Sequence, residues 1–316
     1  MGGSGRLVFS SSGDPIRATG TKVALRDSSL VSTLVSSMSG VAESLFATLF
    51  PSDCRLCGTP LANISRLPVC LPCLSEIKPI EGGTCSVCGE RLLSPHAIVT
   101  DGVEARCGLC QRAAPPFVRA VAYGSYDGGL RELIHLLKYE QVRSATGVLG
   151  RMLAAAINEL EPLWSQPQIA VVSVPLHKRK LRQRGFKQTE LIVQEARKIS
   201  APAGRLVLRS GILERRRETL SQIGLTRHQR RENIRGAFVV RKPDVRKPDM
   251  VRGCEILLVD DVFTTGTTVS ECARVLMRAG ASKIFVATVA RTLKADVKGL
   301  ILRTFGEDEE TLAKAV

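Results

Sequence analysis

The second half of the sequence alternates between short apolar runs and segments in which apolar residues recur every three or four positions. The apolar runs predict strands over 117–123, 169–174, 205–208, 237–240, 255–259 and 283–289. The helical spacing predicts helices over 129–139, 146–160, 187–199 and 267–279. Because nearly continuous apolar strands are buried on both faces, this alternation predicts an α/β protein with a parallel sheet flanked by helices.

The N-terminal part has a different pattern. Residues 1–28 are rich in Gly and Ser without periodicity, which predicts a disordered tail. Apolar residues recur at helical spacing over 29–50, but Ser, Thr and Glu43 interrupt them. This predicts a short amphipathic helix that packs on its own protein, with a bilayer surface as the alternative, and no membrane span. No secretory signal is evident, so we expect a cytoplasmic protein.

Eight of the ten cysteines form four Cys-x-x-Cys pairs, which indicate metal ligands rather than disulfides. The pairs are Cys54 with Cys57, Cys70 with Cys73, Cys85 with Cys88, and Cys107 with Cys110. Four thiolates suit a closed tetrahedral zinc site, so we expect two structural zinc ions. We expect consecutive pairs to share an ion, and a cross-braced pairing is the alternative. We also expect loss of Cys70 to unfold this module alone.

The pattern divides the chain into segments. A double zinc ribbon is expected over 51–112, and Ala113–Pro116 reads as a linker. The α/β domain then follows over 117–292, and 293–316 forms a C-terminal tail.

The sharpest chemical signal is the end of the strand predicted over 255–259. Two adjacent carboxylates, Asp260 and Asp261, are followed by a short turn and a helix start: Thr264, Thr265, Gly266, Thr267 and Thr268. The free N–H groups of a first helical turn bind anions, and glycine lets the backbone approach a phosphate closely. Carboxylates beside that phosphate suit the vicinal hydroxyls of a sugar. The segment predicts a site for a sugar with a 5′-phosphate and free 2′- and 3′-hydroxyls.

Positive charge is concentrated in one stretch of the chain. Residues 174–252 contain 22 Lys/Arg and 7 Asp/Glu, a difference equal to the whole formal charge of +15. The stretch begins with a basic loop after the strand predicted over 169–174, and we expect this loop to bind a pyrophosphate leaving group. Its candidate residues are Pro175, Leu176, His177, Lys178, Arg179 and Arg184. His177 either takes part in this site or only packs within the loop. Lys138 and Arg184 either contact phosphates or are simply exposed to solvent. The basic residues of 214–235 cover the site or contact nucleic acid.

Two resemblances add to this interpretation. Residues 256–268 resemble the phosphoribosyl pyrophosphate signature of type I phosphoribosyltransferases. That resemblance implies Asp260 and Asp261 on the ribose hydroxyls, Thr264 to Thr268 around the 5′-phosphate, and Mg²⁺ bound with the ligand. The 6-oxopurine enzymes of that family have aspartate at the position of Thr264, which argues against hypoxanthine or guanine as acceptor.

Residues 133–139, 175–188, 219–222 and 230–238, together with the cysteine module, resemble the ComF family of phosphoribosyltransferase-like proteins. Lys187 departs from the Asn usual in that family. The resemblance implies the type I phosphoribosyltransferase fold and a link to DNA uptake in natural competence. Two functions are therefore expected. One is phosphoribosyl transfer to an unidentified acceptor, and the alternative is a non-catalytic accessory protein that handles single-stranded DNA with DNA-uptake proteins.

Overall fold

Five parallel strands form the central sheet, in the order β1-β7-β6-β2-β3. This computed structural model describes residues 53–61, 66–92, 105–200, 203–217, 227–241 and 250–293. The strands are β1 (Arg119–Ser125), β2 (Ile169–Ser173), β3 (Leu206–Leu208), β6 (Glu255–Phe263) and β7 (Lys283–Arg291). The predicted parallel α/β sheet is confirmed.

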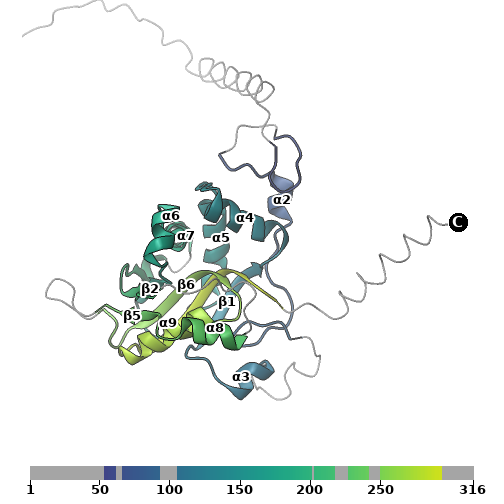
Figure 1. Ribbon diagram of the computed structural model, residues 1–316. Coiled ribbons are helices and arrows are strands. Elements are labelled where there is room, and N and C mark those ends of the chain that lie inside the picture. Colours follow the sequence, from purple (N-terminus) through teal and green to yellow (C-terminus); the bar gives the residue numbers. More distant parts are fainter. Residues whose placement is uncertain are drawn as a thin grey trace, which may run out of the picture. The chain divides into compact units, whose positions relative to one another are not determined.

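Helices cover both faces of this sheet (Figure 1). One face carries α4 (Gly128–Tyr139), α5 (Ala145–Asn158) and α7 (Gln188–Ile199), and the other carries α9 (Thr267–Arg278). Successive residues of a strand point to opposite faces. Accordingly, Leu257 and Val259 of β6 enter the first core, whereas Leu258 enters the second. Short 3₁₀ helices, η2 (Glu161–Leu163) and η3 (Ala203–Arg205), lie in the connections before β2 and β3.

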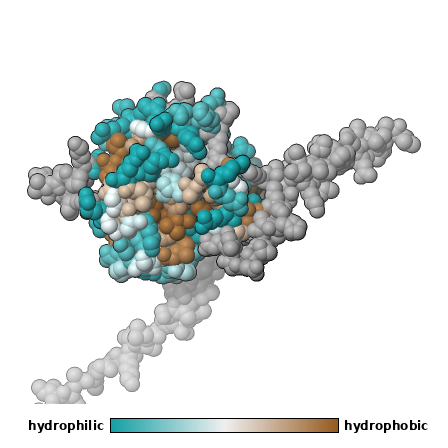
Figure 2. Space-filling model, turned by 90° about the horizontal axis from the view of Figure 1, so that it is seen from below, coloured by the Kyte–Doolittle hydropathy of each residue, from teal (hydrophilic) through white to brown (hydrophobic). Residues whose placement is uncertain are grey.

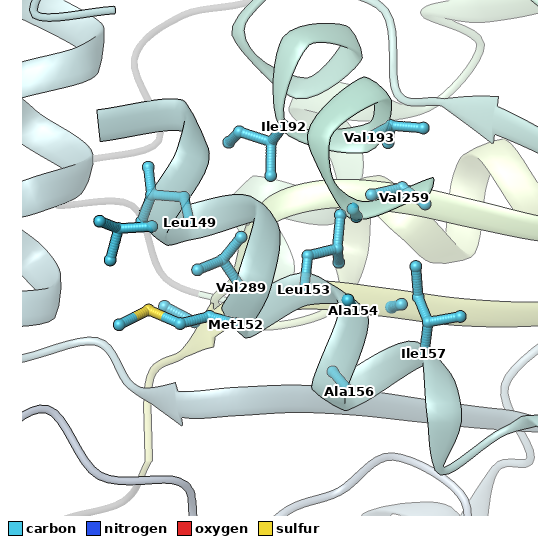
Figure 3. Close-up of a cluster of buried hydrophobic side chains, with 14 of the residues drawn as sticks. Leu149, Met152, Leu153, Ala154, Ala156, Ile157, Ile192, Val193, Val259 and Val289 are labelled. Carbon is cyan, nitrogen blue, oxygen red and sulfur yellow. The ribbon is translucent and has the colours of Figure 1, made fainter. Parts of the chain in front are cut away.

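The first core is built around α5. Figure 3 shows Leu149, Leu153 and Ile157 of this helix among side chains of α7 and of the sheet, including Ile192 and Val289. All of these side chains are completely or almost completely buried. Burying one such side chain contributes about 1.5–3 kcal/mol, so this layer holds α7 firmly against α5 and against β2 and β6 of the sheet.

One sequence expectation about elements was wrong, and a second was correct about the strand but not about its sheet. The basic segment after β2 is mostly a helix, α6 (Lys178–Arg184), rather than a loop. Its residues are good helix formers, and Gly185 ends it in the left-handed conformation at φ 74°. The strand expected at 237–240 is β5 (Phe238–Val240), which pairs antiparallel with β4 (Leu213–Arg215) outside the main sheet. In each of these short strands only one residue is buried, which does not suit a position covered on both faces. A further helix, α8 (Arg227–Ile234), lies between β4 and β5 in the chain.

The two halves of the cysteine module join opposite faces of the sheet (Figure 1). The first half contains α2 (Leu71–Ser75), and its Cys54, Leu67 and Val69 belong to the core of α4, α5 and α7. The second half contains α3 (Gly108–Arg112), and its Cys85 and Val87 belong to the core of α9. The cysteine module therefore shares both cores with the α/β domain.

Some expectations concern parts of the chain that the structure leaves out. The predicted tail 1–28, the helix 29–50 and nearly all of 293–316 lie outside the described residues. None of the helices within the described ranges combines the length and the apolar character that crossing a bilayer requires.

Candidate functional site

The two segments predicted to bind the ligand lie side by side, because β2 and β6 are neighbours in the sheet. The chain leaves β2 towards β3 at one edge and leaves β6 towards β7 on the other side. Open α/β sheets bind ligands at such a switch point, outside the carboxyl ends of the strands. The backbone N–H of Val174 donates to the carbonyl of Val259 at 2.8 Å, which keeps the two strand ends together.

The predicted phosphate-binding turn connects β6 to α9. β6 continues to Phe263, so Asp260 and Asp261 lie within the strand rather than after it. Gly266 caps α9 with φ 72°, and a Cβ at this position would lie 2.5 Å from the ring of Phe263. The hydroxyls of Thr265 and Thr267 are 2.8 Å apart at the start of the helix. The turn therefore requires glycine, and it presents backbone N–H groups at the positive end of a helix dipole.

Asp261 is held by the protein itself. Its Oδ1 accepts a hydrogen bond from Lys138 Nζ at 2.8 Å, and its Oδ2 accepts one from Gln188 Nε2 at 3.1 Å. Burial by itself raises the pKa of Asp261, but the Lys138 ammonium and these hydrogen bonds lower it below its ordinary value. Lys138 is only partly exposed and is held in this ion pair, so it is not the solvent-exposed cation considered from the sequence.

Asp260 has a different environment. It is partly exposed, and its Oδ1 accepts a hydrogen bond from the backbone N–H of Asp261 at 2.9 Å. Desolvation, together with the negative charge of Asp261, raises the pKa of Asp260 to about 7. Of the two carboxylates, Asp260 is therefore the one with acceptor capacity left for a ligand.

A cavity of about 190 Å³ lies at the carboxyl end of β2. Three of the residues predicted for the pyrophosphate line it, namely Pro175, Leu176 and Lys178. Gln188 and Arg215 also line it. The positive charge of Arg215 also acts on Asp260, which associates this cavity with the end of β6.

The other predicted residues of this segment have structural contacts. His177 caps α6, and its Nδ1 accepts a hydrogen bond from the backbone N–H of Arg179 at 3.4 Å. The guanidinium of Arg184 lies over the ring of Tyr139, 5.5 Å from its centre. His177, Arg179 and Arg184 are not among the residues that line the cavity.

The eight cysteines of the four pairs form two clusters. Cys54, Cys57, Cys70 and Cys73 make one, and Cys85, Cys88, Cys107 and Cys110 make the other. Within each cluster all sulfurs lie within 4.8 Å of one another. Consecutive pairs therefore share a site, as expected, and the cross-braced alternative is wrong.

The clusters fit zinc. Tetrahedral coordination with Zn–S distances of about 2.3 Å separates sulfurs by roughly 3.8 Å. The sulfurs of Cys57 and Cys70 are 3.7 Å apart, and those of Cys88 and Cys107 are 3.6 Å apart.

Comparisons with known proteins agree with this architecture. A family model described as a double zinc ribbon domain matches residues 45–112. The DNA utilization protein YhgH of Escherichia coli O157:H7 is 32% identical over 247 residues, which are 77% of this chain and 98% of the relative. The chain belongs to the ComF family. Competence protein F of Haemophilus influenzae (strain Rd) is 28% identical over 230 residues, 70% of this chain and 96% of its own.

Among solved structures, a hypoxanthine phosphoribosyltransferase from Staphylococcus aureus aligns with 49% of this ComF-family chain and 69% of its own. The identity is 14% and the TM-score 0.28. The expected architecture is confirmed: a parallel α/β sheet flanked by helices, with an N-terminal double zinc ribbon.

Sequence reasoning missed two partners in the site of this ComF-family chain. Lys138 and Gln188 lie in segments that carry the family resemblance, but nothing in their spacing shows that both contact Asp261. Lys138 is 123 positions away from Asp261 along the chain. The available signal was that Lys138 directly follows the buried Leu136 and Leu137 of α4, since a charge drawn towards a core needs a partner.

Proposed function

We propose that this chain binds phosphoribosyl pyrophosphate with Mg²⁺ at the switch point between β2 and β6, and transfers the phosphoribosyl group to an acceptor with release of pyrophosphate. The observation that carries the proposal is the position of Asp260. It lies at the end of β6, shortly before the glycine turn that begins α9 and close to the basic cavity that follows β2.

Each part of the ligand finds a group of matching chemistry. The backbone N–H groups of the turn at Gly266 bind the 5′-phosphate, and Asp260 accepts hydrogen bonds from the ribose hydroxyls. Lys178 and Arg215, which line the cavity, neutralise the pyrophosphate as it departs. Asp261 stays bound to Lys138 and Gln188, so it orients the end of β6 rather than contacting the sugar.

The site also suits Mg²⁺, which prefers carboxylate and phosphate oxygens. Both oxygens of Asp261 already accept hydrogen bonds from the protein, so Asp260 is the carboxylate that would help to hold the ion. When bound, the ion supplies positive charge to the leaving pyrophosphate.

Calorimetric titration with phosphoribosyl pyrophosphate and Mg²⁺ tests the proposal. We expect binding by the wild-type protein and a loss of affinity of about tenfold or more in Asp260→Asn, since a charge-assisted hydrogen bond contributes about 1.5–3 kcal/mol. Glu132→Gln, the same chemical change on the exposed side of α4, is the matched control and should bind as the wild type does. Equal affinity in folded wild-type and Asp260→Asn protein would overturn the site.

The acceptor is tested by pyrophosphate release in the presence of candidate nucleophiles. The turn resembles that of the 6-oxopurine enzymes, but it has Thr264 at the position where those enzymes have an aspartate. We therefore expect no turnover with hypoxanthine or guanine. Ligand binding without pyrophosphate release for any acceptor would favour the non-catalytic alternative.

We also infer a DNA-handling role. The relatives are named as a DNA utilization protein and a competence protein, and a specific surface of this chain supports the extension. A hollow of about 450 Å³ where α8 meets α9 is lined by four arginines, together with two glutamates. The arginines are Arg231, Arg235, Arg274 and Arg278.

The arginine hollow suits a phosphate backbone. Arg231, Arg235 and Arg278 are exposed, while Arg274 pairs with Glu271. Figure 2 views the molecule from below Figure 1, where α8 and α9 lie, and shows hydrophilic residues around bands of apolar surface. No aromatic residue lines the hollow, so we expect contacts to the DNA backbone without preference for base sequence.

Fluorescence anisotropy with labelled single-stranded DNA tests this surface. We expect affinity to fall steeply with salt, and Arg235→Glu with Arg278→Glu to weaken binding at least tenfold and to flatten the salt dependence. Arg131→Glu with Arg151→Glu changes the net charge equally on exposed sides of α4 and α5 and should have a much smaller effect. Equal losses in the two double variants would show that only net charge matters.

A further inference from the structure

Arg291, the last residue of β7, connects the second cysteine cluster to the end of the sheet. Its guanidinium is buried and donates to the backbone carbonyl of Cys88. It also pairs with the carboxylate of Glu90 at 2.9 Å. Glu90 is itself buried, 8% exposed. A buried guanidinium is stable only when it is paired, and here both partners come from the second cluster's ribbon.

The same guanidinium supports the phosphate turn. It lies over the ring of Phe263, 4.5 Å from the ring centre. Phe263 also packs against Gly266, so closely that a Cβ added at Gly266 would lie 2.5 Å from the phenyl ring. The backbone N–H of Thr292 donates to the carbonyl of Phe263 at 3.0 Å. A chain of direct contacts thus runs from Cys88 through Arg291 and Phe263 to the turn that begins α9.

Open space separates the second cluster from the turn next to this chain of contacts. A cavity of about 290 Å³ is lined by Cys88, Cys107 and Leu109 on one side and by Thr264 and Thr265 on the other. Arg291 forms part of its wall. The guanidinium is therefore a bridge across a gap, and displacing it would leave the turn without that support.

The first cluster makes its contacts elsewhere. Arg55 pairs with Glu140 at 3.8 Å, at the end of α4. The hydroxyl of Ser144 donates to the carbonyl of Arg66 at 2.6 Å, next to the start of α5. The two clusters can therefore serve as each other's controls.

We propose that zinc in the second cluster and phosphoribosyl pyrophosphate at the turn stabilise each other's binding, with Arg291 as the positioning residue that couples them. The inference rests on the proposed function of the turn. Zinc fixes Cys88, whose carbonyl and neighbouring Glu90 hold Arg291, and Arg291 in turn holds Phe263 beneath Gly266. Because coupling between two binding sites is reciprocal, the ligand must retain zinc in the second cluster as strongly as zinc improves ligand affinity.

Chelator-driven zinc release, followed with a colorimetric zinc indicator on the full chain, tests the coupling directly. In the wild-type protein at equilibrium, we expect phosphoribosyl pyrophosphate with Mg²⁺ to raise the free chelator concentration needed for half-removal of one of two zinc ions about fivefold or more, within the usual range of coupling energies. Cys70→Ser should keep this protection, since it leaves the second cluster intact. Cys107→Ser should lose it.

Arg291 is tested without touching a zinc ligand. We expect Arg291→Met to retain two zinc ions, to lose the protection, and to bind the ligand about fivefold more weakly or worse. Arg291→Lys, which keeps the charge but not the planar fork, should recover part of both effects. Arg55→Met, which removes an arginine of the first ribbon, is the matched control and should change neither.

The outcomes separate the two proposals. If the wild-type protein does not bind phosphoribosyl pyrophosphate, the proposed function is overturned and the coupling with it. If the ligand binds but leaves the release of both zinc ions unchanged, and Arg291→Met binds it normally, only the coupling is overturned. The wild-type measurement decides this point even if a cysteine variant fails to fold.

Discussion

At the scale of single residues, Asp260 and Asp261 are adjacent and chemically identical but differ in their surroundings. Asp261 is enclosed between Lys138 and Gln188, which lower its pKa against the effect of burial. Asp260 is partly exposed, and desolvation with the neighbouring charge raises its pKa. Adjacent residues of a strand face opposite sides, so one carboxylate can anchor the strand end while the other meets the ligand.

This difference predicts a pH dependence. Because the pKa of Asp260 is about 7, we expect affinity for phosphoribosyl pyrophosphate with Mg²⁺ to rise between pH 6 and pH 8 as Asp260 ionises. In Asp260→Asn the affinity should be low and should rise less over this range, only as far as the ionisation of the ligand's own phosphates raises it. Calorimetric titrations at several pH values check it, and a wild-type profile as flat as that of the variant would contradict the assignment.

The same pKa has a consequence for stability, with a definite sign. A carboxyl whose pKa is raised by folding stabilises the protein fully below its unfolded pKa of about 4, and this contribution is lost as pH rises through 7. The melting temperature of Asp260→Asn relative to wild type should therefore be higher at pH 8 than at pH 4. Thermal melts of the two proteins at both values provide the measurement.

At the scale of elements, the junction of β6 with α9 depends on one glycine. Gly266 combines a left-handed backbone with direct contact to Phe263, and both exclude a side chain. The strand continues through the two carboxylates to Phe263, so the turn that remains is only three residues long, 264–266. Such a short turn leaves little freedom for the groups that meet a phosphate.

We expect Gly266→Ala to lower the free energy of unfolding by more than the roughly 1–2 kcal/mol that a left-handed backbone alone costs, and to weaken ligand binding. Gly253→Ala is the matched control, because Gly253 has the same φ of 72° but nothing within 4 Å of an added Cβ. Urea unfolding and calorimetry measure the two effects. Equal losses of unfolding free energy in both variants would show that the ring of Phe263 moves aside without lowering stability.

At the scale of the whole molecule, the two ribbons join opposite faces of one sheet. Their buried residues belong to the same two cores as the helices of the α/β domain. The sequence-based expectation was that loss of Cys70 unfolds the cysteine module alone, which requires the α/β domain to have a core of its own. The structure instead shows that the module and the domain share both cores. Metal binding in the ribbons should therefore contribute to the stability of the whole described unit.

We predict close to two zinc ions per chain, measured by elemental analysis of protein purified without chelator. Stripping them should lower the melting temperature of the α/β domain as well as that of the ribbons, because both cores lose contacts. Near-ultraviolet circular dichroism of Trp164, buried in the core that the first ribbon joins, reports on that core. An unchanged Trp164 melting curve after removal of both ions would indicate independent folding.

The amino-acid sequence was sufficient to predict the class of fold, and it supplied the hypothesis for the ligand site. Apolar runs predicted the parallel strands, and the Asp260–Thr268 segment predicted the phosphate turn, because both features are encoded by residues close together in the chain. The consecutive pairing of the Cys-x-x-Cys units followed the same local logic and is confirmed. A local pattern was insufficient for α6, where a basic run without glycine or proline suits both a loop and a short helix.

Which charges pair with one another became visible in the folded structure alone. Lys138 and Asp261 are 123 positions apart, and Glu90 and Arg291 are 201 positions apart. Periodicity can show that such a residue is buried, but not which partner compensates its charge. The same holds for the ribbons, whose sequences predict metal sites but not the face of the sheet that each one covers. The partners are brought together by strand order and by the packing of helices on two faces, which are properties of the assembled sheet rather than of any segment.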